Sequence, residues 1–144
     1  MKRKNFMVSV ILSLVCACLC FVACNKGDTG SKTVECDVVA TTQTQVVISV
    51  SALTGEWTLK ECMEQLSADG KLTYTISNGM VTQINGKQNT GNSYWMSYIS
   101  DTEFSNTGWG TVEYEGQTYA SAIFGAEELP VKAGHTYIWS YQSF

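Results

Sequence analysis

Residues 58–66 read Thr-Leu-Lys-Glu-Cys-Met-Glu-Gln-Leu, and this stretch decides the fold because it predicts a helix in a chain otherwise patterned for strands. Thr58 followed three residues later by Glu61 is typical of a capping box. Apolar side chains recur at the i, i+3, i+4, i+7 spacing of one helical face, and these are Leu59, Cys62, Met63 and Leu66. Asp69-Gly70 predicts the end of the helix. We therefore expect one short amphipathic helix packed on a sheet.

Strand patterns lie on both sides of this helix. Apolar and polar residues alternate from Thr33 to Ala40, a second β-branched run spans 46–50, and the polar residues between them favour an antiparallel hairpin. Pairs ending in glycine then divide the rest of the chain into six expected strands, at about 72–76, 80–84, 94–100, 111–114, 118–124 and 136–142. This order predicts an α+β fold that is β-grasp-like, with a hairpin and then one helix packed on a mixed β-sheet.

The first 23 residues are interpreted as a lipoprotein signal peptide. Lys2, Arg3 and Lys4 precede an uncharged apolar run over 6–23, as in a secretion signal. The run ends at Ala23-Cys24, which resembles a bacterial lipobox with Cys24 as the lipid attachment site. Cys18 is a competing match, and an uncleaved anchor helix is the alternative. We expect a signal peptide over 1–23, a lipidated Cys24 with a flexible linker over 24–32, and one extracytoplasmic domain over 33–144.

The predicted mature chain is acidic. The full sequence has a formal charge of −4, and removal of residues 1–23 leaves six basic and 13 acidic residues, a charge of −7. This charge argues against a nucleic-acid partner and leaves the acyl chains to supply membrane attachment. Two cysteines remain besides Cys24. Cys36 and Cys62 could form a disulfide in an exported protein, but both fall on apolar faces where free thiols also pack well.

Several short motifs of the domain resemble one known family. They are Thr58-Leu59, Ile84-Asn85-Gly86, Tyr94-Trp95-Met96-Ser97-Tyr98, Pro130-Val131-Lys132-Ala133-Gly134 and Tyr137-Ile138-Trp139. Together they look like the DUF4430 family, which is similar to the C-terminal β-grasp domain of transcobalamin and intrinsic factor. The resemblance covers residues 33–144. The sequence departs from the family at 101–110, where an insertion rich in Ser, Asn, Thr and Gly replaces an Asn-Gly turn.

The resemblance implies a function in ligand capture. In the vitamin carriers this domain closes over one face of cobalamin beside a larger helical domain, which this chain lacks. It therefore implies a surface-anchored lipoprotein that captures a cobalamin-like or other small molecule and passes it to a membrane importer. The alternative is a protein- or glycan-interaction module that mediates adhesion at the cell envelope.

Four aromatic residues are the predicted ligand-binding residues: Tyr94, Trp95, Tyr98 and Trp109. Such rings can form a platform for a flat ligand. Strict alternation places Tyr94 and Tyr98 on one face of their strand and Trp95 on the other, so Trp95 is also a candidate for the core. Trp109 lies between glycines in the polar insertion, where we expect an exposed ring.

The sequence carries few groups suited to catalysis. His135, its single histidine, is interpreted as a turn residue because no motif places a nucleophile or an orienting acid beside it. The acidic residues at 101–103 and 127–128 lack the spacing of a calcium loop, and we expect solvated side chains. We therefore predict a non-catalytic binding protein without a cofactor or metal site.

Overall fold

The computed structural model describes residues 30–144, so the predicted signal peptide and Cys24 lie outside the described residues. Within this part, a six-stranded sheet has the order β1 (Thr33–Thr41), β2 (Gln45–Thr54), β9 (His135–Ser143), β6 (Ser93–Ile99), β8 (Gln117–Ala122), β7 (Ser105–Tyr114). A smaller sheet has the order β3 (Tyr74–Ser77), β4 (Met80–Ile84), β5 (Lys87–Gln88). The helix α1 spans Leu59–Ala68. No helix in residues 30–144 has the length and hydrophobicity needed to cross a membrane.

The predicted helix is confirmed, including its boundaries and buried face. The Thr58 hydroxyl accepts a hydrogen bond from the Glu61 backbone N–H at 3.3 Å, and the Glu61 carboxylate accepts one from the Thr58 N–H at 2.9 Å. These reciprocal bonds satisfy N–H groups that the first helical turn leaves without partners. The side chains of the predicted apolar face are all fully buried: Leu59, Cys62, Met63 and Leu66. The helix ends at Ala68 with Asp69 as its C-cap, where Asp69-Gly70 predicted the end.

The predicted hairpin is also confirmed, but the prediction of a mixed sheet is wrong. β1 pairs with β2 in antiparallel register from Thr33 opposite Thr54 to Thr41 opposite Val46. The other ladders of the large sheet are antiparallel too, namely β2 with β9, β9 with β6, β6 with β8 and β8 with β7. Strand direction follows from which distant strands become neighbours, and side-chain alternation does not encode that choice. The α+β class with a single described helix stands.

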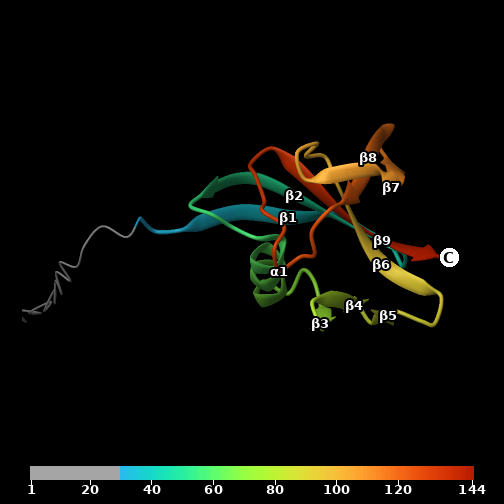
Figure 1. Cartoon of the computed structure of the whole chain (residues 1–144). Helices are drawn as coiled ribbons and strands as arrows, with labels where there is room; N and C mark the ends of the chain where they lie inside the picture. The colour runs from blue at the N-terminus through green and yellow to red at the C-terminus, as the bar shows by residue number, and fades with distance from the viewer. Residues whose placement is uncertain (1–29) are drawn as a thin grey trace, which may run out of the picture.

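The small sheet and α1 lie on the same side of the large sheet, where they enclose the main core (Figure 1). Asn78 and Gly79 join β3 to β4 with φ angles of 53° and 77°, which is the conformation of a two-residue hairpin turn. This turn approaches the segment after β8 so closely that a Cβ on Gly125 would lie 3.3 Å from the Gly79 carbonyl oxygen. β5 was not predicted, because its two polar residues carry no strand pattern.

The structure corrects the predicted insertion loop over 101–110. β7 begins at Ser105, and its pairing with β8 jumps from Asn106 opposite Ser121 to Thr111 opposite Ala120. Residues 107–110 therefore bulge out of the ladder. Trp109 lies on this bulge in an edge strand rather than in a free loop, because β8 supplies pairing partners on both sides of it.

Candidate functional site

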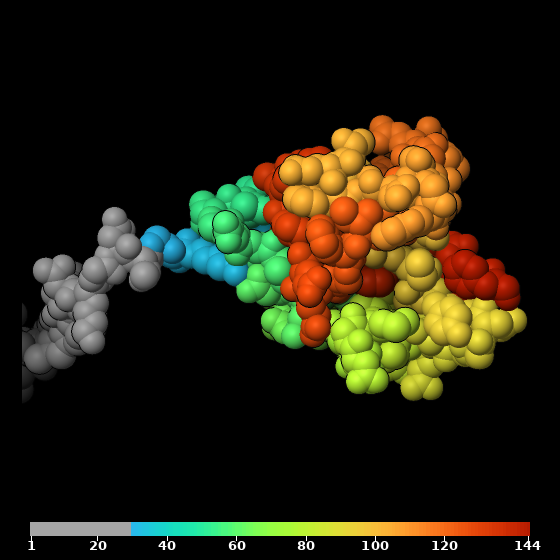
Figure 2. Space-filling view, in the orientation of Figure 1, coloured from blue at the N-terminus to red at the C-terminus, as the bar shows by residue number. Residues whose placement is uncertain are grey.

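A cavity of about 370 Å³ lies where the β3–β4 turn and the segment after β8 meet the large sheet. Its lining comes from the β3–β4 turn at 79–81, from β6 at 95–97, from β8 and the following segment at 121–126, and from Trp109 and Trp139. Figure 2 shows this face of the molecule, with the orange segment after β8 standing above the yellow-green β3–β4 turn. We call this hollow the aromatic cavity. Its volume is in the range of small-molecule sites.

Exposed apolar side chains gather at this cavity. In the described residues, five large apolar side chains are exposed: Val39, Met80, Trp109, Phe124 and Phe144. Three of them, Met80, Trp109 and Phe124, line the aromatic cavity. Exposing clustered apolar side chains to water is unfavourable, and such clusters mark interaction sites.

The lining is also free of charge. Among its residues there is no acidic, basic or histidine side chain, and the hydroxyls belong to Ser97 and Ser121. Because burying an unpaired charge in apolar surroundings is costly, this lining favours an uncharged ligand or an uncharged part of a partner.

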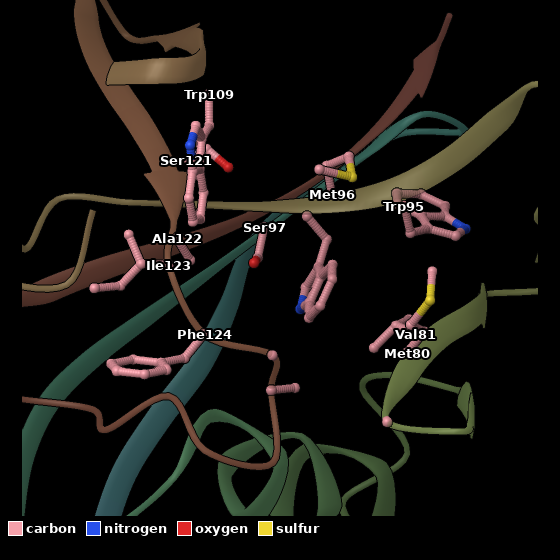
Figure 3. A pocket seen from close by; sticks show the side chains of 14 residues that line it. Met80, Val81, Trp95, Met96, Ser97, Trp109, Ser121, Ala122, Ile123 and Phe124 are labelled. Atoms are coloured by element: carbon pink, nitrogen blue, oxygen red, sulfur yellow. The ribbon is translucent and has the colours of Figure 1, made fainter. Parts of the chain in front are cut away.

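Trp109 reaches the cavity because of the β7 bulge. The Gly108 backbone N–H donates a hydrogen bond to the Asn106 side-chain oxygen at 2.8 Å, which holds the bulge folded. The Trp109 side chain is 61% exposed. Figure 3 shows its ring entering from β7 toward Ser121 and Ala122. The prediction of an exposed ring is therefore confirmed, although its setting is a strand bulge.

Trp95 forms a fixed wall of the same cavity. Its side chain is 4% exposed, and its ring packs edge-on against Tyr141 with 5.4 Å between centroids. The Trp95 indole N–H donates to the Lys87 carbonyl oxygen at 2.8 Å, on the side away from the cavity (Figure 3). Trp95 thus belongs to the core and also lines the site.

Tyr94 and Tyr98 do not line this cavity. The Tyr94 hydroxyl donates to the Gly91 carbonyl oxygen at 2.8 Å, and its ring faces Phe144 at 6.3 Å between centroids. Tyr98 is buried in a separate cluster with Val47 and Ile138, on the opposite face of β6 from Trp95, as alternation predicted. The structure therefore brings together two of the four predicted aromatic residues.

Trp139 is the third tryptophan of the lining, and it was not predicted from the sequence, nor were Met80 and Phe124. It lies on β9 directly opposite Ser97 of β6, and it is 4% exposed. Its indole N–H is buried and has no hydrogen-bond acceptor in the part of the chain that the structure describes. The alternation of Tyr137, Trp139 and Tyr141 along β9 could have indicated a shared aromatic face, but not its distance from Trp109.

Cys36 and Cys62 are both free thiols in the structure. The Cys36 thiol contacts the Cys62 carbonyl oxygen, with 3.8 Å between sulfur and oxygen. Burial, together with the neighbouring Cys36 thiol, raises the pKa of Cys62 to about 12. Since a thiolate is the reactive form, Cys62 is a poor nucleophile at neutral pH.

Ser100 and His135 form a hydrogen-bonded pair that the sequence did not predict. The Ser100 hydroxyl lies 2.9 Å from His135 Nδ1 and accepts a hydrogen bond from the Thr136 backbone N–H.

The neighbouring Asp101 is 5% exposed, so the expected solvated side chain is wrong at this position. Burial has the largest single effect and would raise the pKa of Asp101, but the ion pair with Lys132 at 2.8 Å, the Glu103 N–H and the nearby His135 together lower that pKa. Asp101 therefore forms an ion pair with Lys132 and accepts a hydrogen bond from the Glu103 N–H.

A second, larger cavity of about 610 Å³ has a different character. Two lysines lie over aromatic rings in it, Lys32 over Trp57 and Lys132 over Phe104. Each lysine also forms an ion pair with a glutamate of the same cavity, Glu61 and Glu103 respectively. These ion pairs neutralise both lysines, so the lining offers a ligand no unmatched positive charge, and Glu56 is its one charged residue without an ion pair among residues 30–144.

No family model, curated protein or solved structure matches this chain significantly. The geometry of the aromatic cavity therefore carries the functional argument.

Proposed function

We propose that this chain is a lipid-anchored extracytoplasmic protein whose domain binds an uncharged, flat, mainly apolar small molecule in the aromatic cavity without transforming it. One observation carries the proposal. Met80, Trp109 and Phe124 are exposed to water in the described domain, and all three line a cavity with no charged lining residue.

Trp95 is buried and Trp109 is exposed, and this difference between the two tryptophans supports a binding role. Trp95 is held by a hydrogen bond and an aromatic contact, so it offers a rigid surface. Trp109 stands on a bulge and contributes area without being needed in the core. A preformed wall and an accessible aromatic anchor are typical of sites that recognise flat ligands.

The sequence resemblance suggests how this binding would be used. A domain similar to the C-terminal β-grasp domain of cobalamin carriers would hold a cobalamin-like molecule and pass it to a membrane importer. At about 370 Å³ the cavity would take one flat ring or one edge of a larger molecule. The predicted lipid on Cys24 would keep the domain at the membrane, and binding rather than catalysis is proposed because the cavity lining contains no titratable side chain.

Equilibrium dialysis of the full chain in detergent micelles tests the proposal, with uptake by protein-free micelles subtracted. The probes are 2-ethylnaphthalene, a flat hydrocarbon, and cyanocobalamin. We expect Trp109→Ala to weaken binding of 2-ethylnaphthalene about 30-fold, the equivalent of about 2 kcal/mol for an aromatic anchor.

Phe144→Ala is the matched control. Phe144 is an exposed aromatic residue that does not line the cavity, so its truncation should leave binding unchanged. If neither probe binds, or if both variants behave alike, the aromatic cavity is not a small-molecule site. Loss of binding to envelope glycans or proteins in Trp109→Ala, without binding of either probe, would instead favour the adhesion alternative.

A further inference from the structure

One residue that lines the cavity carries a buried hydrogen-bond donor without an acceptor among residues 30–144. The indole N–H groups of two other buried or half-buried tryptophans are paired: Trp57 donates to the Thr54 carbonyl oxygen at 3.0 Å and Trp95 to the Lys87 carbonyl oxygen at 2.8 Å. The Trp139 N–H has no such partner in the described residues. A buried donor left unpaired is disfavoured and uncommon in native proteins, so this one calls for an explanation.

The position of Trp139 connects this donor to the proposed site. Trp139 lines the aromatic cavity and stands directly opposite Ser97, which lines it too. An indole N–H can only donate, whereas a serine hydroxyl can donate or accept. The polar groups of the cavity therefore include a donor that a ligand acceptor would satisfy, and the absence of basic lining residues disfavours an anionic acceptor.

We infer that the ligand carries an uncharged carbonyl oxygen that accepts a hydrogen bond from the Trp139 indole N–H, while its flat apolar body lies against Trp109 and Met80. This inference rests on the proposed function and specifies its ligand class. The Trp139 nitrogen is shielded from solvent, so binding displaces lining side chains. Met80 is suited to such movement because it is exposed and methionine has three rotatable side-chain bonds.

A matched pair of probes tests the inference. In 2-acetylnaphthalene a carbonyl group replaces one methylene of 2-ethylnaphthalene, and the carbon skeleton is the same. Dissociation constants are measured for both probes with the full chain in micelles, for wild type and Trp139→Phe. We expect the preference for the ketone over the hydrocarbon to be about tenfold greater in wild type than in Trp139→Phe, because phenylalanine keeps an aromatic ring and removes the donor.

Nuclear magnetic resonance provides a second readout that needs no Trp139 variant. Saturation with the ketone should move the Trp139 indole proton signal downfield, and saturation with the hydrocarbon should not. The indole signals of Trp57 and Trp95 serve as internal controls, because both N–H groups already have acceptors.

The outcomes separate this inference from the proposed function. If both probes bind and Trp109→Ala weakens both, but the ketone preference is the same in Trp139→Phe and the Trp139 signal does not respond, the inference is overturned and the proposed function stands. If neither probe binds to wild type, both are overturned.

Discussion

Truncating Trp95 and Trp109 separately should distinguish the fixed wall of the aromatic cavity from its accessible anchor. Trp95 is 4% exposed and loses both its edge-on contact with Tyr141 and its hydrogen bond to Lys87 when it becomes alanine. Burial of this kind is worth about 3–5 kcal/mol. Trp109 is 61% exposed, and its truncation should cost no more than about 0.5 kcal/mol.

The assay is urea denaturation of the full chain followed by far-ultraviolet circular dichroism. We expect Trp95→Ala to lower the free energy of unfolding by about 4 kcal/mol. At roughly 4 °C per kcal/mol for a domain of this size, the thermal midpoint should fall by about 15 °C. Trp95→Phe keeps a ring but not the N–H, and it should fall between wild type and Trp95→Ala.

Two results would refute this reasoning. A loss of more than about 2 kcal/mol in Trp109→Ala would mean that the bulge depends on its ring, so Trp109 would be a core residue. A loss below about 1 kcal/mol in Trp95→Ala would mean that the wall is not packed as described.

Three further predictions concern the helix, the thiols and the anchor. Leu66→Ala should lower the free energy of unfolding by about 2–4 kcal/mol. Lys60 is partly exposed and forms ion pairs with glutamates at 3.3 and 3.9 Å, so Lys60→Ala should lower the free energy of unfolding by no more than about 1 kcal/mol. The reverse order of urea midpoints would mean that the helical face packed on the sheet was assigned wrongly. Folded Cys62 keeps its proton to about pH 12, while the unfolded thiol ionises near its ordinary pKa of 9.0, so its contribution to stability is complete below pH 9 and declines as the pH rises toward 12. The fall in urea midpoint over that interval should be shallower in Cys62→Ala, and an equal fall in both proteins would count against the raised pKa. Cys24→Ser should abolish metabolic labelling with an alkyne fatty acid, and retained labelling would move the lipid to Cys18 or Cys20.

The sequence predicted those parts of the fold that depend on neighbouring residues. The capping box at Thr58 and Glu61 and the apolar spacing up to Leu66 act within ten residues, and the structure reproduces them. The β1–β2 hairpin likewise depends on one short turn. Asn78-Gly79 marked a turn correctly because few other pairs adopt two consecutive positive φ angles readily.

The remaining features depend on residues far apart in the chain. The mixed sheet was wrong because β9 returns between β2 and β6 in antiparallel register, which alternation cannot reveal. The β7 bulge exists because Asn106 and Thr111 pair with adjacent residues of β8. Trp139 was missed as a site residue because it shares a cavity with Trp109 only once β7 pairs with β8 and the segment at Gly125 approaches Gly79.

Backbone amide shifts test the central claim most directly, because they locate the ligand without assuming where it binds. The measurement compares the full chain in micelles with and without saturating 2-ethylnaphthalene. We predict that the largest shifts fall in the segments lining the aromatic cavity, 79–81, 95–97 and 121–126. Shifts centred instead on the second cavity around Trp57 and Phe104 would contradict the assignment of the aromatic cavity as the binding site. The absence of amide shifts on addition of the probe would contradict it as well.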